Sequence, residues 1–331
     1  MKVFFDLSAT ENNNRLRGVG VYSKNLYENL RREGKEGIGV VEGIEEADIL
    51  HYSYFDPFFL TLPYKKHKKT IVTVHDLIPL KFSEHFPCGF RGRVKWELQR
   101  WKLQQAGAII TDSLCSKKDI IHYACIPAEK IHVVCLAPSS DFTQQKIKKK
   151  NYILYVGDVN WNKNIQGLLE AFSGIRDEFP ELVLMLAGTG FFGASREARE
   201  IKILIEKLEI KDRVVMMKDL IMFDLVTLYN QALCYIQPSF YEGFGLPVLE
   251  AMACGCPVIS SNQSSLPEIC GQAAAMFDPY KQGELEKIIT KLLKSQKTRD
   301  ELSVKGIEQA KKFSWEKTTK ETIKVYQQVL L

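Results

Sequence analysis

The sequence lacks several features that would place it at once in a common class of protein. It has no run of 18 apolar residues, so we expect no membrane-spanning helix. Its first ten residues include Asp6 and no long apolar segment, which predicts a first strand and not a signal peptide. No Cys-x-x-Cys pair occurs among the eight cysteines, which favours buried, reduced thiols in a cytoplasmic protein over disulfides or a metal site.

Two further absences bear on function. No Gly-x-Gly-x-x-Gly motif follows the first expected strand, and no Tyr-x-x-x-Lys pair occurs in the context of a dehydrogenase-like enzyme. Both absences argue against a Rossmann enzyme such as a sugar-nucleotide epimerase. No nucleic-acid-binding motif is present either, so only the basic charge would suggest such a partner, and we expect none.

The length and charge indicate two domains with different surfaces. A chain of 331 residues with 45% hydrophobic residues can form two cores. The net charge is +5, but residues 1–150 hold 24 Lys and Arg against 17 Asp and Glu, whereas the remainder hold 21 against 23. The basic first half predicts an anionic partner such as a phospholipid surface or a lipid-phosphate acceptor, unless it is only a solvated face.

Apolar runs alternate with helical patterns along the whole chain, which predicts an α/β fold with two doubly wound parallel sheets. We expect a first domain at 1–145, a basic linker at 146–150 and a second domain at 151–313. A helix at 314–331 either closes the second domain or packs back on the first. The expected strands are 2–7, 48–52, 70–75, 108–112 and 132–137, then 152–156, 182–187, 213–217, 233–237, 257–260 and 273–277.

Residues 238–261, PSFYEGFGLPVLEAMACGCPVISS, read as a loop, a short helix and a strand. Backbone N–H groups of the loop (Gly243, Phe244, Gly245, Leu246) and of the helix N-terminus suit a phosphate. A carboxylate would repel a phosphate, so Glu242 and Glu250 are better placed on sugar hydroxyls. The stretch thus predicts a nucleotide-sugar site. The alternative is an ordinary loop with two surface carboxylates.

Other candidates lie where expected strands end. Gly157 opens a loop before a helix, and Lys163 stands at the start of that helix, where a cation gains nothing from the helix dipole unless a phosphate is present. His75 and Asp76 end a buried strand at the edge where open α/β sheets bind ligands. His75 would bind a sugar or phosphate and Asp76 an acceptor hydroxyl, unless the pair only terminates the strand.

Two further segments of the first domain are candidates for binding a ligand or a membrane. Gly18 and Gly20 are expected just before a helix and would let a donor approach the backbone, with Tyr22 beside an acceptor. Residues 82–102, FSEHFPCGFRGRVKWELQRWK, interleave aromatic and basic side chains. Such a segment can lie on an anionic membrane, but it can equally be a helix that packs on the core through Trp96 and Leu103.

The chain resembles a glycosyltransferase of family 4 almost from end to end. The resemblance is carried, in order, by RGVGVYSKNL, TVHDLIPLKF, IITDSLCSKKDI, YVGDVNWNKNIQGLLEAF, LVLMLAGTG, EGFGLPVLEAMACGCPVI, SLPEICGQAAAMFDP and FSWEKT. It implies the GT-B fold, in which two Rossmann-like domains face a cleft, with the acceptor on the first domain and the donor on the second. It also implies transfer with retention of anomeric configuration and without a bound metal or other cofactor.

The resemblance gives each matching residue a role. Glu242 is expected at the transferred sugar, Glu250 at the ribose, Lys163 at the leaving diphosphate and His75 at the cleft floor. Residues 243–246 match the loop over the diphosphate, and Gly18 and Gly20 match the N-terminal glycine loop. One departure is that Asn162 stands where relatives commonly have Arg, so the second phosphate-binding cation is not assigned.

The sequence therefore predicts a retaining hexosyltransferase with a nucleotide diphosphate sugar as donor. GDP-mannose is the first choice of donor, and a glycan or lipid-linked acceptor in polysaccharide assembly is expected, at the inner face of the cell membrane. One alternative is a UDP-sugar enzyme that transfers glucose or N-acetylglucosamine. Another is a catalytically silent protein that only binds nucleotide sugars.

Overall fold

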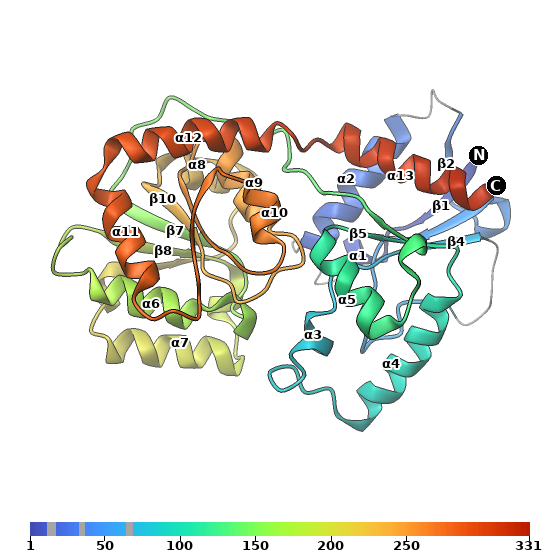
Figure 1. Ribbon diagram of the computed structural model, residues 1–331, viewed down its shortest axis with the longest axis horizontal. Coiled ribbons are helices and arrows are strands. Elements are labelled where there is room, and N and C mark those ends of the chain that lie inside the picture. The colour runs from blue at the N-terminus through green and yellow to red at the C-terminus, as the bar shows by residue number, and fades with distance from the viewer. Residues whose placement is uncertain (12–17, 33–36, 64–68) are drawn as a thin grey trace. The chain divides into compact units, whose positions relative to one another are not determined.

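A computed structural model describes residues 1–11, 18–32, 37–63 and 69–331, which form two compact units (Figure 1). Unit 1 comprises Met1–Ala137 and Phe313–Leu331, and unit 2 comprises Pro138–Lys312. Residues 138–150 belong to unit 2, whereas the sequence suggested a linker at 146–150. The reason is that Gln145 donates its N–H to Asn230 Oδ1 at 2.6 Å and Lys150 donates its N–H to the Gln231 carbonyl at 2.8 Å.

The described part of unit 1 contains one parallel sheet in the order β2-β1-β3-β4-β5-β6. Its strands are β1 (Lys2–Asp6), β2 (Gly39–Val41), β3 (Ile49–Tyr52), β4 (Lys69–Thr73), β5 (Ala108–Thr111) and β6 (Ile131–Val133). All four residues of β3 and of β5 are buried, as expected for strands covered on both faces. The sequence predicted these strands to within a few residues but missed β2, which is a three-residue edge strand that begins with glycine.

The described helices of unit 1 follow β1, β4 and β5 in the sequence, and α13 comes from residues 315–330. They are α1 (Ser8–Glu11), α2 (Gly18–Arg32), α3 (Ile78–Lys81), α4 (Gly89–Gln104), α5 (Leu114–Ala124) and α13 (Trp315–Leu330). Gly18 and Gly20 were expected to precede α2, but Gly18 is its first residue and Gly20 is buried within its first turn. Residues 12–17, which precede α2, lie outside the described residues.

Helix α13 packs on unit 1, which answers the question that the sequence left open. Ser314 caps it by accepting the Lys317 N–H at 3.2 Å. The Thr318 hydroxyl donates to the Cys135 carbonyl at 2.7 Å, and the Tyr326 hydroxyl is 2.6 Å from His51 Nδ1. The last helix of the chain therefore completes the first unit.

Unit 2, whose residues are all described, holds a second parallel sheet in the order β12-β11-β10-β7-β8-β9. Its strands are β7 (Tyr152–Val156), β8 (Val183–Ala187), β9 (Val214–Met217), β10 (Cys234–Gln237), β11 (Val258–Ser261) and β12 (Ala274–Phe277). Strand β10 lies between β11 and β7, although β8 and β9 separate it from β7 in the sequence. This order brings the loops after β7 and β10 together at the carboxyl edge of the sheet.

Unit 2 has its own helices and its own core. The helices are α6 (Ile165–Gly174), α7 (Arg196–Lys207), α8 (Met222–Gln231), α9 (Leu246–Ala253), α10 (Leu266–Cys270), α11 (Glu284–Lys294) and α12 (Gln296–Ala310), and a 3-10 turn, η4 (Trp161–Lys163), precedes α6. Helix α6 packs on this core through Leu168, Leu169 and Phe172, which are fully buried. The two-sheet α/β architecture is therefore as the sequence predicted. None of the helices in the described ranges is both long and apolar enough to cross a membrane.

Candidate active site

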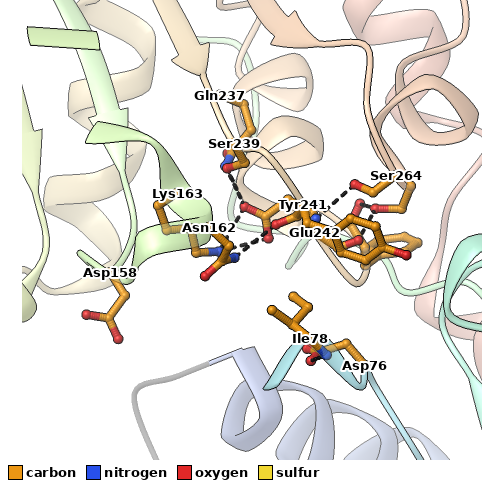
Figure 2. A network of polar contacts seen from close by, with 12 residues as sticks. Asp76, Ile78, Asp158, Asn162, Lys163, Gln237, Ser239, Tyr241, Glu242 and Ser264 are labelled. Atoms are coloured by element: carbon orange, nitrogen blue, oxygen red, sulfur yellow. Dashed lines mark hydrogen bonds and ion pairs between the residues drawn. The ribbon is translucent and has the colours of Figure 1, made fainter. Parts of the chain in front are cut away.

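The carboxylate of Glu242 is the centre of a dense polar network in unit 2 (Figure 2). Lys163 donates from Nζ to both carboxylate oxygens at 2.8 Å. Gln237 Nε2 and Ser239 Oγ donate to Oε1 at 2.8 and 2.7 Å. The backbone N–H of Glu242 donates to Ser264 Oγ at 2.8 Å. The side chain is buried, so these donors replace the water that a buried charge would otherwise need.

Lys163 and Glu242 meet because of the strand order. Lys163 ends η4, after β7, and Glu242 lies in the loop after the neighbouring strand β10. Asn162 fastens the two loops: its carbonyl accepts the Phe240 N–H at 2.8 Å and its side-chain amide donates to the Tyr241 carbonyl at 2.9 Å. The residue that stands where relatives have Arg is thus buried and holds the loops together.

The loop from Glu242 into α9 needs glycine. Gly245 has φ +108°, and a Cβ there would lie 2.8 Å from Leu266 Cδ2. Phe244 is buried, and its carbonyl accepts the Ser265 hydroxyl at 2.8 Å. Gly243 lies between Glu242 and Phe244, and Leu246 begins α9, with Pro247 in the first turn, where proline is favoured. The loop is therefore held rigidly in front of the N-terminus of α9.

Glu250 lies in α9, half-buried, with less support than Glu242. The Tyr229 hydroxyl donates to its Oε2 at 3.0 Å. Burial raises the pKa of Glu250 to about 7, and the hydrogen bond from Tyr229 offsets only part of this effect. Tyr229 packs edge-on against Tyr235, whose hydroxyl donates to Gln237 Oε1. A line of buried side chains therefore connects the two glutamates.

Gly157 allows the ends of β7 and β8 to approach closely. Its φ is +154°, and its N–H donates to the Ala187 carbonyl at 2.9 Å. A Cβ on the neighbouring Gly188 would lie only 2.0 Å from the Gly157 carbonyl oxygen. Both positions thus require glycine for packing, whatever else they contact.

In unit 1, His75 forms a pair with Asp112 at the carboxyl ends of β4 and β5. Its Nδ1 is 2.6 Å from Asp112 Oδ2. Burial lowers the pKa of His75, but the charge and hydrogen bond of Asp112, together with Asp76, outweigh it, so the net pKa is raised. Burial raises the pKa of Asp112 despite the histidine. His75 Nε2 is buried and has no hydrogen-bond partner among the described residues.

Tyr22 packs against the ring of His75. It is 1% exposed, and its ring packs edge-on against the His75 ring with centroids 4.7 Å apart. Its hydroxyl is 2.9 Å from Thr73 Oγ1, which is 2.8 Å from His51 Nε2. Burial lowers the pKa of His51 to about 3, so this imidazole is neutral. A direct contact between Tyr22 and an acceptor stays a prediction, since the structure shows its hydroxyl engaged inside the unit.

Asp76 caps the short helix α3. Its Oδ1 accepts the Ile78 N–H at 3.0 Å, and the side chain is half-buried. Its expected bond to an acceptor hydroxyl also stays a prediction. In the described ranges, no three His, Cys, Asp or Glu side chains gather in an arrangement that could hold a metal ion.

Several residues of these networks were not predicted from the sequence. Gln237, Ser239 and Ser264 surround Glu242, and Tyr229 contacts Glu250. Gln237 ends a strand and Tyr229 lies in a helix, whereas the two serines lie in loops. Asp112 had a usable signal. It follows a buried strand at the same edge of the sheet as His75, so the rule applied to His75 would have selected it too.

Comparison with known proteins accounts for both units. Residues 12–137 match the family model described as Glycosyltransferase Family 4, and residues 138–312 match Glycosyl transferases group 1. The chain is 32% identical over 293 residues to O-antigen chain mannosyltransferase B of Escherichia coli, covering 84% of this chain and 75% of that one. It is 30% identical over 264 residues to the serotype-specific mannosyltransferase WbdA of Escherichia coli. This match covers 76% of this chain but only 32% of WbdA.

Solved structures show the same fold at low sequence identity. Anabaena HepE, in a complex with UDP-glucose, superposes with a TM-score of 0.77 over 99% of both chains at 15% identity. Sucrose-phosphate synthase from Thermosynechococcus elongatus has a TM-score of 0.71 at 21% identity, over 98% of this chain and 82% of that one. The chain therefore belongs to the group 1 and family 4 glycosyltransferases, has their GT-B fold of two α/β units, and is a hexosyltransferase.

Proposed function

We propose that this hexosyltransferase is a mannosyltransferase that uses GDP-mannose and extends a surface polysaccharide of the O-antigen type. The observation that carries the proposal is the 32% identity, over most of both chains, with an O-antigen mannosyltransferase. The Lys163–Glu242 pair supports it, because the residues expected at the diphosphate and at the transferred sugar are in direct contact.

The pair can serve both parts of the donor. The Lys163 ammonium has three N–H donors, and the carboxylate of Glu242 occupies two of them. The third remains to bond an oxygen of the leaving diphosphate, while N–H groups of residues 243–246 contribute further donors. Glu250, which is bonded to Tyr229, is assigned to the ribose hydroxyls.

We assign retention of configuration to front-face attack. Glu242 is enclosed by four donor contacts to its carboxylate, so it serves better to bind a sugar hydroxyl than to attack the anomeric carbon. The acceptor hydroxyl would then attack from the side of the leaving diphosphate and pass its proton to a phosphate oxygen. The bond from the anomeric carbon to that phosphate breaks as the new glycosidic bond forms. His75 is proposed to bond the reacting sugar through Nε2.

No metal ion is part of this proposal, because Lys163 and the backbone donors supply the positive charge. Addition of EDTA should leave the rate unchanged, and a rate restored only by Mg²⁺ or Mn²⁺ would contradict this point.

The test of the donor is an assay of the purified chain with GDP-mannose, UDP-glucose and UDP-N-acetylglucosamine, with NMR of the product. We expect transfer from GDP-mannose and an α-linked mannose, the configuration of the donor. Preference for a UDP sugar would overturn the donor assignment, and a β-linked product would overturn retention. Binding of a nucleotide sugar without transfer or hydrolysis would indicate a silent binding protein.

An anionic membrane is the proposed surface partner of unit 1, at the cytoplasmic face. In helix α4, Leu103 is buried and Trp96 is half-buried. One face of the helix therefore packs on the core, which was one of the two alternatives predicted from the sequence. Its other side exposes Phe90 at 82% and Trp101 at 57%, among Arg91 and other cations. Exposed aromatic rings among cations suit the interface of an anionic bilayer.

Sedimentation with phosphatidylglycerol vesicles tests this surface. The chain should sediment with anionic vesicles, less with purely zwitterionic ones, and be released by high salt. The double variant Phe90→Ser/Trp101→Ser should lose sedimentation but keep its melting temperature. Equal binding of parent and variant would exclude this face.

A further inference from the structure

Three aromatic side chains of unit 2 form a stack beside the Lys163–Glu242 pair. The Phe240 ring stacks with the Trp161 ring at a centroid distance of 5.0 Å and with the Tyr280 ring at 5.1 Å. The interplanar angles are 29° and 22°, so the rings are nearly parallel. We call these three residues the aromatic ladder.

The ladder is built into the same loops as the candidate catalytic residues. Trp161 lies two residues before Lys163, and Phe240 lies two residues before Glu242. Asn162, which lies between Trp161 and Lys163, connects the two loops. Its carbonyl accepts the Phe240 N–H at 2.8 Å. The position of the ladder is therefore fixed relative to the transferred sugar that Glu242 is proposed to hold.

The ladder leads away from the side proposed for the nucleoside. Tyr280 follows β12, an edge strand of the sheet. Glu250, assigned to the ribose, is bonded to Tyr229, which packs against Tyr235 of the interior strand β10. A donor that places its nucleoside at Glu250 and its sugar at Glu242 thus leaves the ladder for another molecule.

The ladder has apolar surface in contact with solvent and little net charge. Tyr280 is 61% exposed, and Trp161 and Phe240 are half-buried. The charged residues next to Tyr280 in the sequence, Asp278 and Lys281, form an ion pair at 3.8 Å. Exposed rings of this kind bind neutral ligands that offer an apolar face, and a pyranose does so through its C–H groups.

We propose that the aromatic ladder is an acceptor subsite, which holds a neutral sugar residue of the growing glycan by stacking on Tyr280. The proposal rests on the proposed function, because it takes the acceptor to be a glycan whose terminal hydroxyl reaches the sugar held by Glu242. It places part of the acceptor on unit 2, in addition to the contacts predicted for unit 1.

Kinetics with α-mannose oligosaccharides of one to four residues test the subsite. Tyr280→Ala should raise the acceptor KM for the tetrasaccharide on the order of tenfold, the loss of one stacking contact, with a much smaller change in the GDP-mannose KM. Tyr280→Phe keeps the ring and should restore the acceptor KM. Phe223→Ala, which removes an equally exposed ring from α8, is the matched control and should change neither constant.

Saturation-transfer NMR with the mannose tetrasaccharide separates this proposal from the proposed function, since it needs no transfer. The C–H protons of the probe should receive saturation from the parent chain and from Tyr280→Phe, and much less from Tyr280→Ala. Equal signals from all three, or none from the parent, would overturn the subsite even if mannosyl transfer is observed. A rise in donor KM alone for Tyr280→Ala would assign the ladder to the nucleotide instead.

Discussion

Glu242 and Glu250 belong to one short stretch of chain, yet their surroundings differ in kind. Glu242 has a cation on both oxygens and two neutral donors on one of them. Glu250 has the Tyr229 hydroxyl, and burial raises its pKa to about 7. A carboxylate with several fixed donors is held in one position. The raised pKa of Glu250 lets that carboxyl change its protonation near neutral pH.

The difference indicates separate tasks. We propose that Glu242 serves a step in which geometry decides the rate, and Glu250 a binding contact whose strength depends on its charge. Variants of the two environments should therefore change different kinetic constants.

Replacing Glu242 should have the largest effect. In Glu242→Gln one carboxylate oxygen becomes an amide nitrogen, which faces the donors and leaves Lys163 without its charge partner. We expect kcat to fall on the order of 10³-fold with a melting temperature close to that of the parent. Glu181→Gln, an exposed change in the same unit, is the control. Near-parental turnover in Glu242→Gln would remove Glu242 from the reaction.

Lys163→Met should have the second largest effect. It removes the cation from both Glu242 and the proposed diphosphate contact while keeping most of the length of the side chain. We expect kcat to fall on the order of 10²-fold. The double variant Lys163→Met/Glu242→Gln should be hardly slower than Glu242→Gln alone, because the two residues act as a unit. If the two fold-changes in kcat multiply in the double variant, the residues act separately. Lys202→Met, at an exposed position, is the surface control.

Glu250→Gln should affect binding and its pH dependence. In the parent, donor KM should rise as the pH falls below about 7, because the protonated carboxyl accepts fewer hydrogen bonds from the ribose. The variant should show about a tenfold higher KM at pH 8 and no such titration. An identical pH profile in both proteins would contradict the assignment of this step to Glu250.

The same variant makes a prediction about stability. The pKa of Glu250 is about 7 in the folded protein against an ordinary 4.5, so the folded state favours the protonated form. The charged carboxylate of Glu250 therefore destabilises the folded protein. This effect is absent when the pH is below the ordinary pKa and fully present above pH 7. Glu250→Gln should therefore be more stable than the parent at pH 8, by on the order of 1–3 kcal/mol, and lose this advantage towards pH 4.5. Chemical denaturation at the two pH values measures it.

Gln237→Met should have the smallest effect. It removes one donor from Glu242 but leaves Lys163 and Ser239, so kcat should fall about fivefold with little change in donor KM. The change removes the short bond from the Tyr235 hydroxyl to Gln237 and leaves the Val156 carbonyl at 3.5 Å as its acceptor, which lowers stability. Adding Tyr235→Phe should restore the melting temperature but not kcat. Recovery of both would mean that Gln237 acts only through folding.

The sequence predicted the elements of the fold better than their partners. Strand positions follow from apolar runs, and α9 follows from Pro247 and Gly255, which fit its two ends. The contact between Lys163 and Glu242 could not be predicted from such local patterns. The two are 79 residues apart, and they meet only because β10 inserts beside β7 and not beside β9.

The same limit applies to unit 1. The amphipathic pattern of α13 predicts a buried face but not which sheet it covers, since either core can accept it. Gly18 and Gly20 were expected just before α2, yet Gly18 is its first residue and Gly20 is buried within its first turn. A glycine near the end of a helical pattern does not show on which side of the helix boundary it lies.

The path of α13 has a consequence for how the protein is made. Tyr326 bonds His51 across 275 residues of chain, so unit 1 lacks helix α13 until synthesis has passed this helix. Unit 2 is a single continuous segment, residues 138–312, and all of it leaves the ribosome earlier. The second unit can therefore fold first on the ribosome. It is also the part of the chain that can be expressed alone, whereas an N-terminal fragment that ends near residue 137 would leave apolar surface of its sheet uncovered.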